Sequence, residues 1–333
     1  MNSLPLPQRL RAFWKKEWFM LSLLLAVMLA SAVPALGKTG GLLRLDLLSN
    51  AGVALIFFLT GLGLSLTELR GGLLRWRVHL LVQLSTYALF PLLWWGFNTL
   101  LGRWLPPELA LGFAYLCALP STISSSVAMT ALAKGNVPAA IFNATLSSLL
   151  GVILTPALLA LMAGANGQGG LGLGDAVLKI AQLLLLPLVL GQLARPLLLT
   201  WHQRYKRYTS LIDRWVIIML VFAAFSDSVE AGLWRSHGAG LLVQALAGAA
   251  LLLALVLGLS TWVARRLHLA REDEIAAVFC GSKKTLASGV PMAKLLFGAH
   301  PALGVIVLPI MFYHQLQLLA CSMLAGRYAR RGA

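Results

Sequence analysis

Two adjacent lysines stand where charge is most costly for this chain. Lys283 and Lys284 lie near the midpoint of an apolar segment, residues 272–297, that is long enough to cross a bilayer. A charge at the centre of a membrane costs at least about 2.5–3.5 kcal/mol, so such residues usually face an internal cavity. All eleven Asp and Glu residues fall at the ends or flanks of apolar segments. At least one of the two ammonium groups is therefore predicted to face a polar cavity, unless the segment is shifted and both lysines reach the interface.

A second apolar segment, residues 108–133, is interrupted by polar residues. A proline and a run of hydroxyl side chains follow each other at Pro120–Ser125, and the lysine segment is itself interrupted by two glycines and Pro291. Proline and glycine disfavour continuous helix. Both segments are therefore expected to be non-helical near Pro120–Ser125 and Gly281–Thr285, and the two breaks are expected to meet.

Side chains in and around these two segments are the candidate ligands for a substrate or ion. They share a hydroxyl, amide, imidazole or ammonium group within an otherwise apolar stretch. They are Thr122, Ser124, Ser125, Ser126, Thr130, Asn143, Thr145, Ser147, Ser282, Lys283, Lys284, Thr285, Ser288, His314 and Gln315.

The composition identifies the elements that must position these residues as membrane helices. Of 333 residues, 59% are hydrophobic and 11% are charged, against about 45–50% apolar and about 25% charged in soluble domains. Apolar runs such as 52–66 and 241–261 are unbroken, whereas the strands of an outer-membrane barrel alternate in polarity. The predicted fold class is an all-α integral membrane protein.

A window of about 20 residues finds ten candidate spans. They are residues 18–37, 47–69, 77–101, 108–133, 138–163, 175–199, 208–228, 237–264, 272–297 and 301–326. A glycine-rich linker at 164–174 divides them into five-helix halves, 18–163 and 175–326. An odd number of spans in each half predicts inverted repeats, and the broken spans four and nine occupy the same place in each half.

The basic residues predict the orientation. The net charge is +16, and with the N-terminus inside, eighteen basic residues fall in cytoplasmic segments against four outside. Both termini are therefore predicted to be cytoplasmic, in a bacterial inner membrane. The partner of this charge is membrane lipid, and no nucleic acid is expected. Residues 1–17 are predicted to form an interfacial helix or a simple basic flank, and residues 327–333 a cytoplasmic tail.

Several motifs resemble the bile acid:sodium symporter superfamily, most closely its YfeH-type branch, which includes solute carrier family 10 member 7. They are Leu119–Thr130, Lys134–Val137, Asn143–Ser148, Leu154–Ala157 and Gly281–Met292. The resemblance implies a secondary transporter that works by alternating access. It also implies a core domain in which spans four and nine unwind and cross at mid-membrane, and a mobile panel of spans one, two, six and seven.

The resemblance also implies sodium as the coupling ion, but the matching positions lack its ligands. Ser282 falls at the position of a glutamate in the sodium-coupled members, and Leu286 at that of a glutamine. The hydroxyl positions of the fifth span fall on Ala140 and Ala144. Sodium prefers oxygen ligands and is repelled by a nearby ammonium. These replacements argue against sodium coupling, and no other cofactor is expected.

The predicted substrate is a small organic anion. Half-helix N-termini attract anions, the hydroxyls near Pro120 add donors, and a lysine adds positive charge. The lysine is predicted to take the place of sodium as a tethered cation, with Lys283 slightly favoured because it follows Ser282. Burial disfavours the charged form of an amine, so transport is expected to be proton-coupled or an exchange.

Other functions and residues are weaker candidates. A regulatory or channel-like membrane protein of the same fold is the main alternative. An intramembrane enzyme would need a recognisable catalytic motif around its serines or His314, and none is present. Asp213 and Arg214 are expected to pair near the interface, Gln317 to form an interhelical hydrogen bond or line the cavity, and Gly61 to allow close helix packing.

Overall fold

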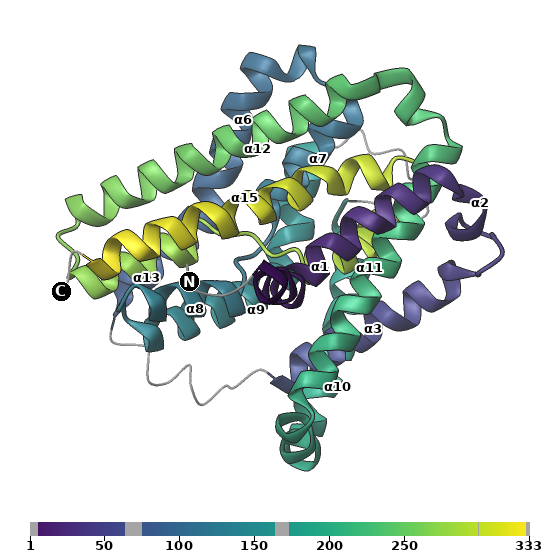
Figure 1. Ribbon diagram of the computed structural model, residues 1–333. Helices are drawn as coiled ribbons and strands as arrows, with labels where there is room; N and C mark the ends of the chain where they lie inside the picture. Colours follow the sequence, from purple (N-terminus) through teal and green to yellow (C-terminus); the bar gives the residue numbers. More distant parts are fainter. Residues whose placement is uncertain (1–5, 64–74, 164–172, 299, 331–333) are drawn as a thin grey trace.

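The computed structural model describes residues 6–63, 75–163, 173–298 and 300–330, and within these ranges all regular structure is helical (Figure 1). The first half contains α1 (Leu6–Ala32), α2 (Pro34–Gly37), α3 (Leu45–Gly63), α5 (Trp76–Leu84), the π-helical turn η1 (Ser85–Leu89), α6 (Phe90–Leu101), the short turn η2 (Gly102–Trp104), α7 (Pro107–Ala118), α8 (Ser124–Leu132) and α9 (Val137–Ala163). The second half contains α10 (Leu173–Arg204), α11 (Lys206–Glu230), α12 (Leu233–Arg266), α13 (Arg271–Gly281), α14 (Gly289–Phe297) and α15 (Leu303–Arg330).

Five helical stretches in the described residues are long and apolar enough to cross a membrane. They are Trp76–Trp104, Val137–Met162, Lys206–Glu230, Gly238–Arg266 and Leu303–Arg330. Shorter apolar stretches occur at Leu21–Ala32, Leu48–Gly63 and Pro107–Ala118. These helices agree with the predicted helical membrane protein, while the division into ten spans stays a prediction.

Helix extends into both segments that are predicted to flank the membrane spans. α15 continues to Arg330, so most of the expected tail at 327–333 is helix, with Arg327 and Arg330 in the last turn. Basic residues stabilise a helix C-terminus through its dipole. α1 begins at Leu6, so residues 6–17 of the expected interfacial segment are continuous with the first span. Most of the predicted linker 164–174 lies outside the described residues.

Both predicted breaks are present. α7 ends at Ala118 and α8 begins at Ser124, with Leu119 extended before Pro120, as the residue before a proline prefers. α13 ends at Gly281 and α14 begins at Gly289. The second break therefore extends three residues beyond the predicted Gly281–Thr285.

A third irregularity, the π turn η1, was not predicted. The Phe90 N–H bonds to the Ser85 carbonyl, one residue further back than in an α-helix. The next residue in the same pattern is Pro91, which has no N–H to offer the Thr86 carbonyl. One main-chain carbonyl inside the third span is thereby left without its helical donor, and Pro91 was the sequence signal that could have revealed it.

The helices pack in two groups around the breaks. α3 packs on α10 and α1 on α11, while α7 contacts α9 and α15. The α3–α10 contact is very close: a Cβ on Gly61 would lie 2.1 Å from the Leu188 carbonyl oxygen, and one on Gly191 would lie 2.1 Å from that of Phe58. The predicted packing role of Gly61 is confirmed, because only a residue without a side chain fits there.

Candidate functional site

The two broken helices meet, as the sequence predicts. The Thr285 N–H donates to the Pro120 carbonyl at 3.1 Å. From the other break, the Ser121 hydroxyl donates to the Cys280 carbonyl at 2.6 Å. Unwound backbone inside an apolar region needs such partners, because lipid offers none.

Gln317 and Tyr313 of α15 satisfy further main-chain groups of the second break. The Gln317 side chain accepts from the Lys284 N–H and donates to the Lys284 carbonyl, both at 2.8 Å. It also lies 2.9 Å from Nδ1 of His314. The Tyr313 hydroxyl donates to the Ser282 carbonyl at 2.6 Å. Gln317 therefore holds the unwound peptide in place, and of the two roles the sequence left open it takes the interhelical hydrogen bond.

The Lys284 ammonium lies in a cage of main-chain carbonyls. Its Nζ donates to three oxygens, those of Thr86 at 2.9 Å, Cys117 at 2.9 Å and Leu119 at 2.5 Å. The ring centroid of Phe90 lies 4.0 Å from the same nitrogen, a cation–π distance. An ammonium has three N–H donors, so every donor of Lys284 is used.

The broken and irregular helices are what supply these carbonyls. Cys117 lies in the last turn of α7 and Leu119 follows its end, where carbonyls have no helical donor and the dipole is negative. The Thr86 carbonyl is left without its donor by the π turn. Two helical defects, the end of α7 and the π turn, thus create a cation site, and Lys284 from the third defect fills it.

Lys283 is also fully buried, but it has fewer partners. Its Nζ donates to the Ser125 carbonyl at 2.7 Å and lies 5.4 Å from the ring centroid of Phe279. The sequence predicts that at least one of the two ammonium groups faces a polar cavity. In the structure Lys284 points instead into its carbonyl cage, and Lys283 points toward one carbonyl in the first turn of α8.

A separate cavity of about 180 Å³ lies between the broken helices and α3, α10 and α11. The residues that start α8 and α14, Ser124 and Ser288 among them, line one side. Thr60 of α3 and Ser148 of α9 add hydroxyls. Four of the candidate residues line this cavity: Thr122, Ser124, Thr285 and Ser288.

Asp213 of α11 lines the same cavity, which corrects the expectation of an interfacial ion pair. Its Oδ1 is buried without a hydrogen-bond partner among the described residues. Arg214 instead lies over the rings of Trp18 and Phe19, at 5.5 and 5.6 Å from their centroids. Because α11 begins at Lys206, Asp213 lies about two turns inside the helix. The cavity beside the two breaks is therefore lined by a carboxylate.

The remaining candidates do not line the cavity. Ser125 supplies a carbonyl to Lys283, while Gln315 is half-buried on α15. Buried hydroxyls and amides mostly bond to nearby main chain, which is how polar side chains are satisfied inside helix bundles. Four side chains donate to main-chain carbonyls: Ser126 to Phe279, Thr130 to Ser126, Asn143 to Ala139 and Ser282 to Val278. The Ser147 hydroxyl accepts from the Ser121 N–H, and Thr145 is buried in α9.

Comparison with known proteins identifies the family of this chain. The model of the SBF-like CPA transporter family matches residues 17–330. An uncharacterized protein of Pseudomonas aeruginosa is 46% identical over 94% of this chain and 93% of its own length. YfeH of Escherichia coli is 43% identical over 94% of this chain and 93% of its own. Mouse sodium/bile acid cotransporter 7 is 31% identical over 93% of this chain and 92% of its own length.

The family match covers both broken helices, the Lys284 cage and the cavity beside them. The matched relatives extend over nearly the whole chain, so the likeness is not confined to one motif. An integral membrane protein with two discontinuous helices in contact is also what a transporter site requires. This chain belongs to the SBF-like CPA transporter family, the family of the bile acid:sodium symporters.

Proposed function

We propose that this protein is a secondary transporter of a small organic anion that works by alternating access. The observation that carries the proposal is the cavity at the N-termini of α8 and α14. A helix N-terminus presents unpaired N–H groups and a partial positive charge. The N-terminus of α8, with the hydroxyls of Thr122 and Ser288, suits a carboxylate, sulfate or phosphate group, whereas at α14 the Val290 N–H already bonds to the Leu286 carbonyl. At about 180 Å³, the cavity is smaller than drug-sized pockets of about 300–1,000 Å³, which favours a small ligand.

The proposed architecture is ten spans in two inverted five-helix repeats, residues 18–163 and 175–326, in an inner membrane with both termini cytoplasmic. α7 with α8 forms span four, and α13 with α14 forms span nine. Their matching positions and their contact support a crossing at mid-membrane. The cavity separates α3, α10 and α11 from the broken helices, so movement of these panel helices opens the site to alternate sides.

Lys284 is proposed to replace the sodium ion of coupled relatives. Its ammonium occupies a cage of three carbonyls, the kind of oxygen ligand that also binds alkali cations. Lys283, which the sequence slightly favoured, has one such partner. A permanently tethered cation stabilises the breaks in every state, so sodium is not required for the site to form.

Asp213 is proposed to couple the anion to a proton. An ionised carboxylate in so small a cavity repels an anion, so the anion binds when Asp213 carries a proton. Asp213 is the ionisable side chain among the described residues that line this cavity, and Arg214 is turned toward Trp18 and Phe19. Lower pH protonates a carboxylate, so anion binding strengthens as pH falls.

The first test is a thermal-shift screen of purified protein against monocarboxylates, sulfonates and phosphate esters, at acidic and at neutral pH. The strongest ligand is then followed into proteoliposomes, with an inward proton gradient and with choline in place of sodium. We expect uptake without sodium that follows the proton gradient. Loss of uptake in choline would overturn the tethered-cation proposal.

Asp213→Asn separates binding from coupling. Asparagine imitates the protonated acid, so the variant should bind the anion equally at both pH values and exchange it, yet fail to accumulate it from a proton gradient. Glu230→Gln is the matched control, since it removes a carboxylate of the same helix that pairs with Lys38 outside the cavity. The unpartnered carboxylate also favours a second candidate, a cationic ligand. A cationic ligand is supported if organic cations stabilise the protein and Asp213→Asn abolishes that stabilisation.

A further inference from the structure

A larger groove, of about 600 Å³, lies between α12 and α15. The two helices run side by side over much of their length (Figure 1). Gly258 and Ala320 are among the residues that line the groove, and they leave part of its wall without large side chains. A Cβ built on Gly258 would meet no atom within 4 Å, so this glycine faces open space.

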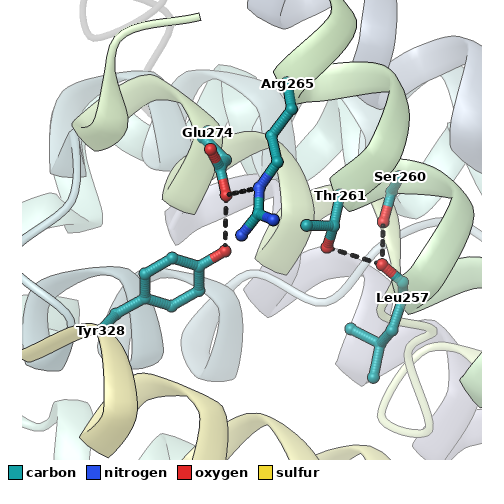
Figure 2. Close-up of polar contacts among 6 residues, drawn as sticks. All are labelled: Leu257, Ser260, Thr261, Arg265, Glu274 and Tyr328. Carbon is teal, nitrogen blue, oxygen red and sulfur yellow. Dashed lines mark hydrogen bonds and ion pairs between the residues drawn. The ribbon is translucent and has the colours of Figure 1, made fainter. Parts of the chain in front are cut away.

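Three arginines gather at the end of the groove, near the C-termini of both helices: Arg265, Arg266 and Arg327. Arg265 is held by Glu274, with Nε and Oε1 3.3 Å apart (Figure 2). The Tyr328 hydroxyl donates to the same carboxylate oxygen at 2.8 Å. Neither Arg266 nor Arg327 forms an ion pair with a described residue, so the groove keeps a net positive charge.

The lining changes character along the groove. Leu257 and Gly258 come first along α12, Trp262 follows one turn later, and the arginines come after another turn. α15 has the same order, from Ala320 to Arg327. Tryptophan favours the boundary between hydrocarbon and headgroups, and Arg266 lies over its ring at 5.4 Å from the centroid. An apolar floor, an aromatic boundary and a cationic end match the acyl chain, glycerol and phosphate of a phospholipid.

We propose that this groove binds one anionic phospholipid of the cytoplasmic leaflet. The phosphate lies against Arg266 and Arg327, and one acyl chain follows Gly258 and Leu257. The excess of basic residues on this side of the protein places the groove at the cytoplasmic surface, where anionic lipids are attracted to basic pockets between helices. The site lies outside the transport cavity and does not depend on what the protein carries.

Charge and shape can be tested separately on the full-length protein in detergent. Delipidated protein is titrated with phosphatidylglycerol and with phosphatidylcholine, and native mass spectrometry counts the bound lipid. Wild type should retain one phosphatidylglycerol and little phosphatidylcholine. Arg266→Gln with Arg327→Gln should weaken that binding by roughly thirty-fold, since each arginine near an anionic headgroup contributes a factor of about five. Arg330→Gln, one turn beyond the groove on α15, should leave it unchanged.

Gly258→Leu tests the acyl chain with every charge in place. The leucine fills open space rather than colliding with protein, and it replaces a poor helix former, so the fold should not suffer. Bound phosphatidylglycerol should fall at least ten-fold. Gly326→Leu, at another glycine with no atom within 4 Å of a built Cβ and outside the groove, should bind as wild type does.

Three results would overturn the proposal. One is equal retention of phosphatidylglycerol and phosphatidylcholine by wild type. Another is undiminished binding by Gly258→Leu, which would mean that no chain enters the groove. The third is competition by glycerol 3-phosphate at the concentration at which the lipid saturates, which would indicate a soluble phosphate site.

Discussion

The crossing of the broken helices and the groove between α12 and α15 use positive charge in opposite ways. Lys284 is fully buried, and its three donors bind three carbonyls. Arg266 and Arg327 are exposed beside an open groove and have no carboxylate partner among the described residues. A cation whose donors are all used holds protein together, whereas a cation with unused donors beside a cavity can take a ligand.

The largest effect is expected from Lys284→Met, which removes the charge and shortens the unbranched side chain by one atom. Three carbonyls then lose their donor in a buried site, where each unsatisfied group costs about 1–3 kcal/mol. Removal of the buried ammonium offsets part of that cost, which leaves a total of about 3–5 kcal/mol. We expect the free energy of unfolding in detergent to fall by about that amount. A change below about 1 kcal/mol would show that the cage does not hold the crossing together.

Lys283→Met should have a smaller effect. It removes one charged hydrogen bond and one cation–π contact, and it relieves the burial of a poorly paired ammonium. We expect a loss of about 1–2 kcal/mol, measured by the same unfolding experiment. If Lys283→Met proved the more damaging of the two, the ranking would reverse and Lys283 would be the tethered cation.

Arg266→Gln combined with Arg327→Gln should have the smallest effect on stability, within about 0.5 kcal/mol in detergent free of phospholipid. The same variant should lose the stabilisation that phosphatidylglycerol gives to wild type. Thermal melting with and without added lipid measures both quantities. A large loss without lipid would make these arginines structural, like Lys284, and would remove the contrast between the two regions.

Some of the site was predictable because it depends on local backbone chemistry. Pro120 cannot donate a main-chain hydrogen bond and restricts Leu119 to extended conformations. Gly281 and Pro291 weaken the other helix in the same way. The position of the first break and the start of the second follow from these residues, although the second extends further than predicted. Their matching places in the two halves predict that they meet.

Other parts depend on contacts between distant segments. Asp213 was assigned to an ion pair with its neighbour Arg214, and only the packing of α11 shows that the two side chains face opposite surroundings. The sequence leaves two roles open for Gln317, an interhelical hydrogen bond or a place in the cavity wall. Only the packing of α15 against the unwound peptide of Lys284 shows which one it takes. Neither contact can be predicted from neighbouring residues in the sequence.

The sequence by itself determined that the chain is a helical membrane protein, where two of its helices break, and that charge lies at one break. Composition, hydrophobic run length and the geometry of proline and glycine act locally, so they can be read along the chain. The tertiary structure alone decided where each charge points. A lysine side chain is long enough to reach several neighbours, and the carbonyls that capture Lys284 come from the end of α7 and from a π turn about 200 residues earlier in the chain. Those carbonyls become acceptors only when their own helices are interrupted and packed against the second break.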